Sequence, residues 1–88
     1  MRVYVLETEV AYEGSTLEGI YHWLSDAQAH GDRLLATGYY DSVCVSAWNT
    51  APGESALTCD GLWRRYGSQA GIKEERKRPE HWHVVKEP

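Results

Sequence analysis

Residues 2–12 alternate between two kinds of position with the period of two that a β-strand has. One set of positions carries mainly apolar side chains, namely Tyr4, Leu6, Thr8, Val10 and Tyr12. The other set begins apolar and ends acidic, with Val3, Val5, Glu7 and Glu9. The pattern predicts a strand that is buried at its beginning and half-exposed at its end.

The segment that follows predicts a return strand. Residues 13–16 (Glu-Gly-Ser-Thr) favour a turn, and residues 19–24 form a second run of β-prone side chains. Two such runs joined by a short turn are typical of an antiparallel hairpin.

Residues 26–36 change to the helical period. Small or apolar side chains recur there at spacings of three and four, at Ala27, His30, Gly31, Leu34 and Leu35. Ser25 and Gln28 have the spacing of a capping box, and the Thr37-Gly38 pair is a helix stop signal. Because Ala27 and Gly31 are small, we expect the first turns of this helix to approach a sheet closely.

Three later segments complete the pattern. Residues 42–48 alternate and predict a third strand, whose two sides carry Val43, Val45, Ala47 and Cys44, Ser46, Trp48, respectively. Residues 55–71 fit either a short strand or a short helix capped by Asp60. Residues 73–79 indicate a solvated connector, and residues 81–86 a last strand at a sheet edge.

The composition fits one small domain over residues 1–88, with 42% hydrophobic and 25% charged residues. Combined with the pattern, this predicts an α+β fold: a mainly antiparallel sheet of about four or five strands with at least one helix on one face. Apolar runs are too short for a signal peptide or a membrane span, so we expect a cytoplasmic protein.

The two cysteines, Cys44 and Cys59, lack C-x-x-C spacing and are expected to be buried thiols. A Cys nucleophile is disfavoured because Cys44 lies in a β-branched run. The sequence contains no G-x-S-x-G, H-E-x-x-H, G-x-x-x-x-G-K-[ST] or G-x-G-x-x-G motif. It therefore favours a non-enzymatic protein without a cofactor.

The net charge of −4 is unevenly distributed. Residues 1–60 carry nine acidic and two basic side chains, whereas residues 61–88 carry four acidic and seven basic. Such an asymmetry is typical of an acidic surface that binds a basic partner, or of a basic segment that docks on its own acidic half.

The first alternative predicts an acidic protein-interaction module whose partner is a protein with a basic surface. Its binding residues would be Glu7, Glu9, Glu13, Glu18, Asp26, Tyr12, Tyr21 and Trp23. Docking onto a nucleic-acid-binding protein would make it an inhibitor that competes with the nucleic acid. The exposed edge strands also make a homodimer feasible.

A second function class uses the basic residues of the C-terminal segment for phosphate contacts and base stacking. The residues concerned are Arg64, Arg65, Arg76, Lys77, Arg78 and Trp63. With His81 and His83 nearby, the same group could form a small ribonuclease with a histidine as acid or base. The acidic N-terminal half opposes this reading, because it would repel a polyanion.

His81 and His83 also allow a third reading, because imidazoles two residues apart on a strand share one face and could begin a metal site. A third ligand is missing from the neighbouring sequence, so the prediction is that no metal is bound.

The N-terminal half resembles a group of small uncharacterised proteins from phages and bacteria. The resemblance covers about the first forty residues and is carried by Val3-Tyr4-Val5-Leu6, Tyr12-Glu13-Gly14, Gly19-Ile20-Tyr21 and the helix after them. It implies a hairpin followed by a helix packed on a sheet. It supplies no activity or catalytic residue. The charge asymmetry, small size, aromatic content and absent catalytic motifs lead to a further hypothesis, a phage-encoded inhibitor of nucleic-acid-handling or host-defence machinery, in the manner of an anti-CRISPR protein.

Overall fold

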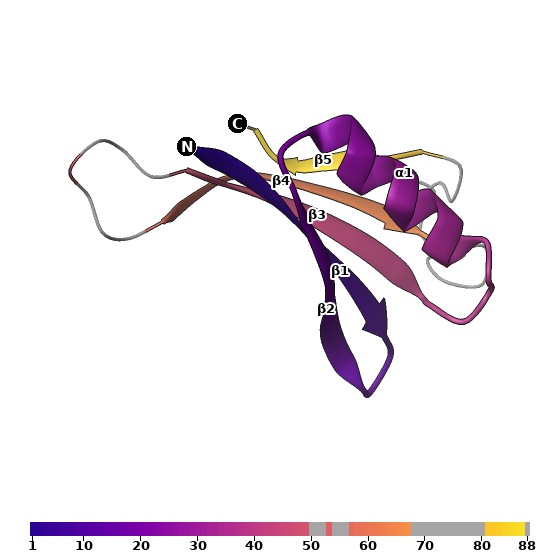
Figure 1. Ribbon diagram of the computed structural model, residues 1–88. Helices are drawn as coiled ribbons and strands as arrows, with labels where there is room; N and C mark the ends of the chain where they lie inside the picture. Colours follow the sequence, from indigo (N-terminus) through magenta and orange to yellow (C-terminus); the bar gives the residue numbers. More distant parts are fainter. Residues whose placement is uncertain (50–52, 54–56, 68–80, 88) are drawn as a thin grey trace.

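The computed structural model contains a five-stranded antiparallel sheet and one α-helix (Figure 1). It describes residues 1–49, 53, 57–67 and 81–87. The elements in chain order are β1 (Arg2–Val10), β2 (Gly14–Tyr21), α1 (Leu24–Leu35), β3 (Ser42–Asn49), β4 (Thr58–Tyr66) and β5 (His83–Lys86). Their order across the sheet is β2-β1-β3-β4-β5, and every neighbouring pair is antiparallel. The predicted α+β class is confirmed.

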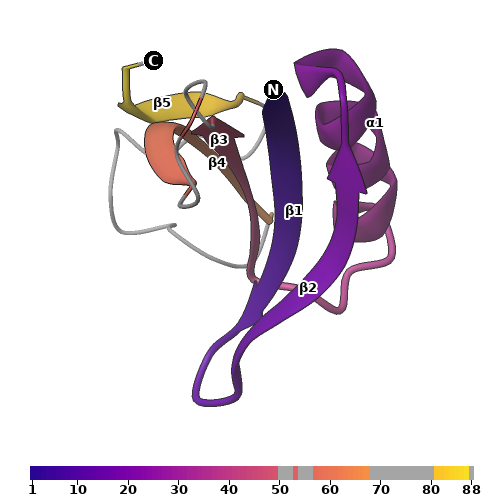
Figure 2. The ribbon, with the colours of Figure 1, turned by 60° about the vertical axis from the view of Figure 1, so that its left-hand side comes forward.

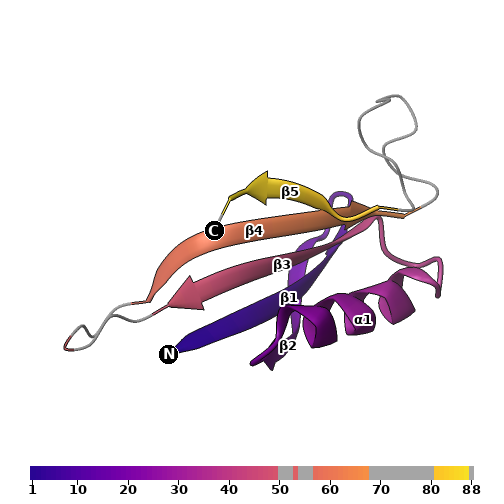
Figure 3. The same cartoon turned by 90° about the horizontal axis from the view of Figure 1, so that it is seen from above.

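The strand register assigns the two faces of the sheet. Leu6 of β1 pairs with Val45 of β3, and Val45 pairs with Trp63 of β4, so these three side chains share one face. Helix α1 lies along this face and contacts β1, β2 and β3 (Figure 3). We call the opposite face, which no described element covers, the open face.

The core forms between α1 and the covered face. Its fully buried members are Leu6, Ala27, Val43, Val45 and Ala47, and Trp63 is 8% exposed. The small residues of α1 make the close approach possible, as predicted. A Cβ added at Gly31 would lie 3.2 Å from a Val43 methyl carbon and 3.1 Å from the Trp82 ring.

One carboxylate ties the C-terminal end of the chain to α1. Asp32 accepts a hydrogen bond of 3.0 Å from the Trp82 indole nitrogen. The same carboxylate forms an ion pair with Arg65, at an oxygen–nitrogen distance of 2.6 Å. The Trp82 ring at the same time packs over Gly31. The second alternative for the charge asymmetry, a basic segment docking on its own acidic half, therefore holds for Arg65.

The predicted hairpin is present, but its turn comes earlier than the sequence indicated. The chain reverses at Ala11–Glu13, where Tyr12 has a positive φ of 69° and the Glu13 amide donates to the Val10 carbonyl. A left-handed tyrosine is uncommon, and no sequence rule assigns it. As a result β1 ends at Val10, and β2 already begins at Gly14.

The predicted capping box does not form. Helix α1 begins at Leu24 with Trp23 as its N-cap, and no side chain caps it. The first helical residue is thus Leu24, one residue before Ser25, and its side chain packs against the core. Residues 58–66 of the ambiguous segment form β4, so the helix capped by Asp60 is wrong, and the last strand begins at His83 rather than His81.

The close approach at Gly31 gives the first testable prediction. Gly31→Leu should lower the free energy of unfolding by about 1–3 kcal/mol, because the added side chain overpacks the contact with Val43 and Trp82. Ala29→Leu, on the exposed side of the same helix, should change it by less than about 0.5 kcal/mol. Urea unfolding followed by circular dichroism measures both, and equal effects would contradict the packing described here.

Candidate functional site

The central strand of the open face carries small polar side chains. Ser42, Cys44 and Ser46 of β3 point away from α1, yet each is at most 7% exposed. Glu9 and Arg64 of the flanking strands form an ion pair across β3, and together with Cys44 and Ser46 they line a shallow hollow of about 280 Å³. The middle of the open face is therefore a polar layer.

An ion pair across the sheet organises this layer. The Arg64 Nε atom of β4 lies 3.1 Å from the Glu9 carboxylate of β1, which also accepts a 3.1 Å hydrogen bond from the Ser42 hydroxyl. Burial alone lowers the pKa of the Arg64 guanidinium, but Glu9 and Tyr66 outweigh burial, so its pKa is raised. The Arg64 guanidinium therefore stays charged beside Glu9.

The thiol of Cys44 lies between the strands that carry this ion pair, and its 7% exposure predicts low reactivity. Burial raises its pKa to about 11, and Glu9 and Glu7 add to the increase, whereas Arg64 opposes it. Because a thiol, unlike a thiolate, is a poor nucleophile, Cys44 is not placed to act in catalysis. The predicted buried thiol is confirmed for Cys44, whereas Cys59 is half-exposed.

Beside the polar layer, toward β2, lies an apolar groove of about 420 Å³. The apolar groove is lined by Val5, Glu7, Leu17, Trp48 and Leu57. Leu17 is 58% exposed and Leu57 48%, so the groove presents large apolar side chains to solvent. The Trp48 ring is held in place by a 2.8 Å hydrogen bond from its indole nitrogen to Ser46.

Glu7 is the charged residue of the apolar groove. Unlike Glu9, it makes no hydrogen bond or ion pair with any residue of the described part of the chain. An unpaired carboxylate at an apolar surface is a feature that folding does not require, because a neutral side chain would fill the same space at no electrostatic cost.

A β-bulge in β2 places apolar side chains at the edge of the groove. Leu17 pairs with Glu7 and Gly19 with Leu6, which leaves Glu18 as the extra residue. The bulge changes the phase of the strand, so Leu17 and Ile20 both face the open side although they are three residues apart. Glu18 turns to the covered face, where it accepts a 2.8 Å hydrogen bond from Thr8.

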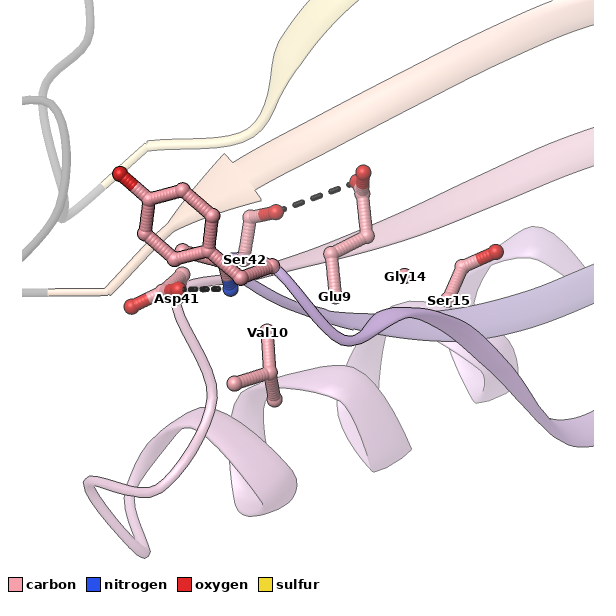
Figure 4. A pocket seen from close by; sticks show the side chains of 8 residues that line it. Glu9, Val10, Gly14, Ser15, Asp41 and Ser42 are labelled. Atoms are coloured by element: carbon pink, nitrogen blue, oxygen red, sulfur yellow. Dashed lines mark hydrogen bonds between the residues drawn. The ribbon is translucent and has the colours of Figure 1, made fainter.

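A second hollow, of about 410 Å³, lies at the base of the hairpin turn (Figure 4). In it Glu9 accepts from Ser42, and Asp41 accepts from the backbone amide of Ala11 (Figure 4). Both carboxylates thus stabilise the hairpin by hydrogen bonds to neighbouring segments.

The predicted acidic binding residues do not form one surface. Glu7 and Glu9 share the open face, but Glu18 lies on the covered face and Asp26 in the first turn of α1. Glu13 and the fully exposed Tyr12 lie in the hairpin turn, which extends beyond α1 (Figure 2).

The other two aromatic residues predicted for that surface, Tyr21 and Trp23, also lie apart from Glu7 and Glu9. Tyr21 is hydrogen-bonded to His30 of α1, and Trp23 is the exposed N-cap of the helix. Of the predicted binding residues, only Glu7 lines the apolar groove with a carboxylate that has no partner among the described residues.

The predicted basic cluster is divided by the sheet. Arg64 and Arg65 point to opposite faces, and each is held in an ion pair, with Glu9 and Asp32 respectively. Trp63, expected to stack on bases, is instead a core residue. Arg76, Lys77 and Arg78 lie outside the described residues.

The sequence also raised the question of a metal site at His81 and His83. No three His, Cys, Asp or Glu side chains of the described chain are placed to hold a metal ion, and His83 instead pairs with Arg64 across the β4–β5 edge. Within the same residues, no helix has both the length and the apolarity to cross a membrane. Comparison with known protein families, curated proteins and solved structures finds no match, so the resemblance to phage proteins stays a prediction.

Sequence reasoning missed most of the apolar groove. The alternation of residues 42–48 already assigned Trp48 to the side opposite Val43, so the position of Trp48 on the open face could be predicted. Leu17 and Ile20 could not, because a spacing of three assigns them to opposite faces of a regular strand. Only the bulge brings them together.

The two cysteines provide the second prediction. Iodoacetamide at about pH 8 should react with folded Cys59→Ser, which retains Cys44, at least about tenfold more slowly than with Cys44→Ser, which retains Cys59. The cause is the burial of Cys44, which also raises its pKa to about 11. In urea the two rates should become similar, and equal rates in the folded proteins would contradict an inert Cys44.

Proposed function

We propose that the chain is a non-enzymatic protein-interaction module that binds a basic patch of a protein partner through the apolar groove. The observation that carries the proposal is the carboxylate of Glu7, which has no partner among the described residues and lies between exposed apolar side chains. A lysine or arginine of the partner fits such a site, because its aliphatic stem packs on apolar groups while its charged end meets the carboxylate.

Two further features support a cationic ligand. Trp48 lines the groove beside Glu7, and an indole face attracts a cation in addition to its apolar contact. The net charge of −4 attracts a basic surface at long range and raises the rate of encounter.

An acidic module in the cytoplasm that covers a basic protein patch competes with nucleic acid for that patch. Inhibition of nucleic-acid-handling machinery is the role that this chemistry fits, and a phage-encoded form would act on host defence. The direct nucleic-acid-binding alternative receives less support, because Arg64 and Arg65 are already paired with carboxylates.

The experiment compares two charge reversals, Glu7→Lys and Glu13→Lys, that change the net charge equally. A display library of random peptides is first selected on the wild-type protein, and we expect sequences rich in Lys or Arg beside apolar residues. Glu7→Lys should weaken binding of the selected peptides at least about tenfold, because it replaces attraction with repulsion in the groove. Glu13→Lys, in the exposed turn, should weaken it by no more than about twofold at physiological salt.

Equal losses in the two variants would mean that only net charge matters and would contradict the groove. Selection of acidic peptides would do the same. Tight, steeply salt-dependent binding of a single-stranded oligonucleotide by the wild-type protein would favour the nucleic-acid alternative instead.

A further inference from the structure

β2 is the edge strand nearest the apolar groove, and its outer backbone side faces no other described strand. Edge strands of natural proteins usually carry devices that prevent pairing with another chain, such as lysines, prolines or very short length. β5, at the other edge, has four residues and contains Lys86. β2 has eight residues, and none of them is lysine, arginine or proline.

The side chains of β2 on the open face are apolar and exposed. Leu17 is 58% exposed and Ile20 61%, and the bulge places both on this face. The charged residue of β2, Glu18, is turned to the covered face and bound to Thr8. The open side of this edge therefore offers free backbone groups and apolar contact, without a charge of its own.

The edge and the apolar groove form one continuous surface. Leu17 belongs to both, and it pairs directly with Glu7 on β1. A strand added beside β2 would lie about 5 Å from Leu17 and about 10 Å from Glu7, since neighbouring strands are spaced by roughly 4.8 Å. A lysine or arginine on that strand crosses Leu17 with its stem and reaches the Glu7 carboxylate with its charged end.

We propose that the partner docks as an extended segment that pairs with the edge of β2 and adds a sixth strand to the sheet. The proposal rests on the proposed function and specifies its ligand, a strand that carries both apolar and basic side chains on the face it shares with the open face. Its apolar residues pack on Leu17 and Ile20, and one basic residue binds Glu7. Main-chain hydrogen bonds supply affinity, and the alternate side chains supply specificity.

Charge decides between this ligand and a second copy of the chain. Two copies joined at β2 would bring together two chains of net charge −4, each with an unpaired Glu7 near the junction. Like charges at an interface oppose association, whereas a basic strand neutralises the carboxylate. The surface therefore favours a basic partner over self-association.

The test uses a synthetic peptide, Val-Thr-Lys-Thr-Val-Thr-Lys, called the Val-Lys peptide, whose Val and Lys side chains share one face of a strand. Its control, the Val-Glu peptide, has Glu in place of each Lys. Amide hydrogen exchange of the protein is followed by NMR with and without each peptide. The Val-Lys peptide should slow the exchange of alternate β2 amides, because those that point outward become hydrogen-bonded. It should bind at least about tenfold more tightly than the Val-Glu peptide.

Two matched variants test the side-chain contacts. Ile20→Thr keeps a β-branched side chain on β2 but removes apolar surface, and it should weaken binding of the Val-Lys peptide about fivefold to tenfold. Val85→Thr, with 52% exposure on β5, is the control and should leave binding within about twofold. Equal effects would overturn docking at β2.

The outcomes separate this inference from the proposed function. Binding of the Val-Lys peptide that depends on Glu7 but leaves β2 exchange unchanged would overturn strand addition alone. Absence of any Glu7-dependent binding, with this peptide or with library peptides, would overturn the proposed function itself. A dimer in sedimentation that protects β2 without peptide and dissociates in Ile20→Thr would assign the edge to a second copy.

Discussion

The structure depends on the close contact between one short helix and one face of the sheet. Ala27 and Gly31 bring α1 onto Leu6, Val43 and the neighbouring core residues. Among the described residues, every buried hydrophobic side chain except Cys44 belongs to this core. A twelve-residue helix covers three strands on one side only. The other face must therefore be stable without a covering element, and its composition reflects that requirement.

The open face meets the requirement by pairing its own polar groups. Within the described residues no buried side-chain nitrogen or oxygen lacks a hydrogen bond, because Glu9 binds Arg64 and Ser42 while Ser46 accepts from Trp48. One acidic side chain of the N-terminal half and one basic side chain of the C-terminal half neutralise each other in this way. Glu7, two residues from Glu9 on the same strand, differs because it has no partner among the described residues and lines an apolar groove.

The sequence predicted the elements well where periodicity is regular. The strands over residues 2–12 and 42–48, the helix with its small contact residues, and the α+β class all follow from spacing and burial. Two of the errors lie where the backbone departs from regularity, at the left-handed Tyr12 and at the bulge of Glu18. The bulge places Leu17 at the apolar groove, and neither departure leaves a pattern in the order of residues.

The central claim is that Glu9 stabilises the fold whereas Glu7 does not and is available to bind a partner. The most direct measurement is the unfolding free energy of Glu7→Gln and Glu9→Gln, two substitutions of the same chemistry two residues apart on one strand. Glu9→Gln should destabilise the protein by about 1 kcal/mol, because it leaves the half-buried Arg64 without its counter-charge, and Glu7→Gln should cost less than about 0.3 kcal/mol. Equal losses would mean that Glu7 is a structural residue and would contradict the account.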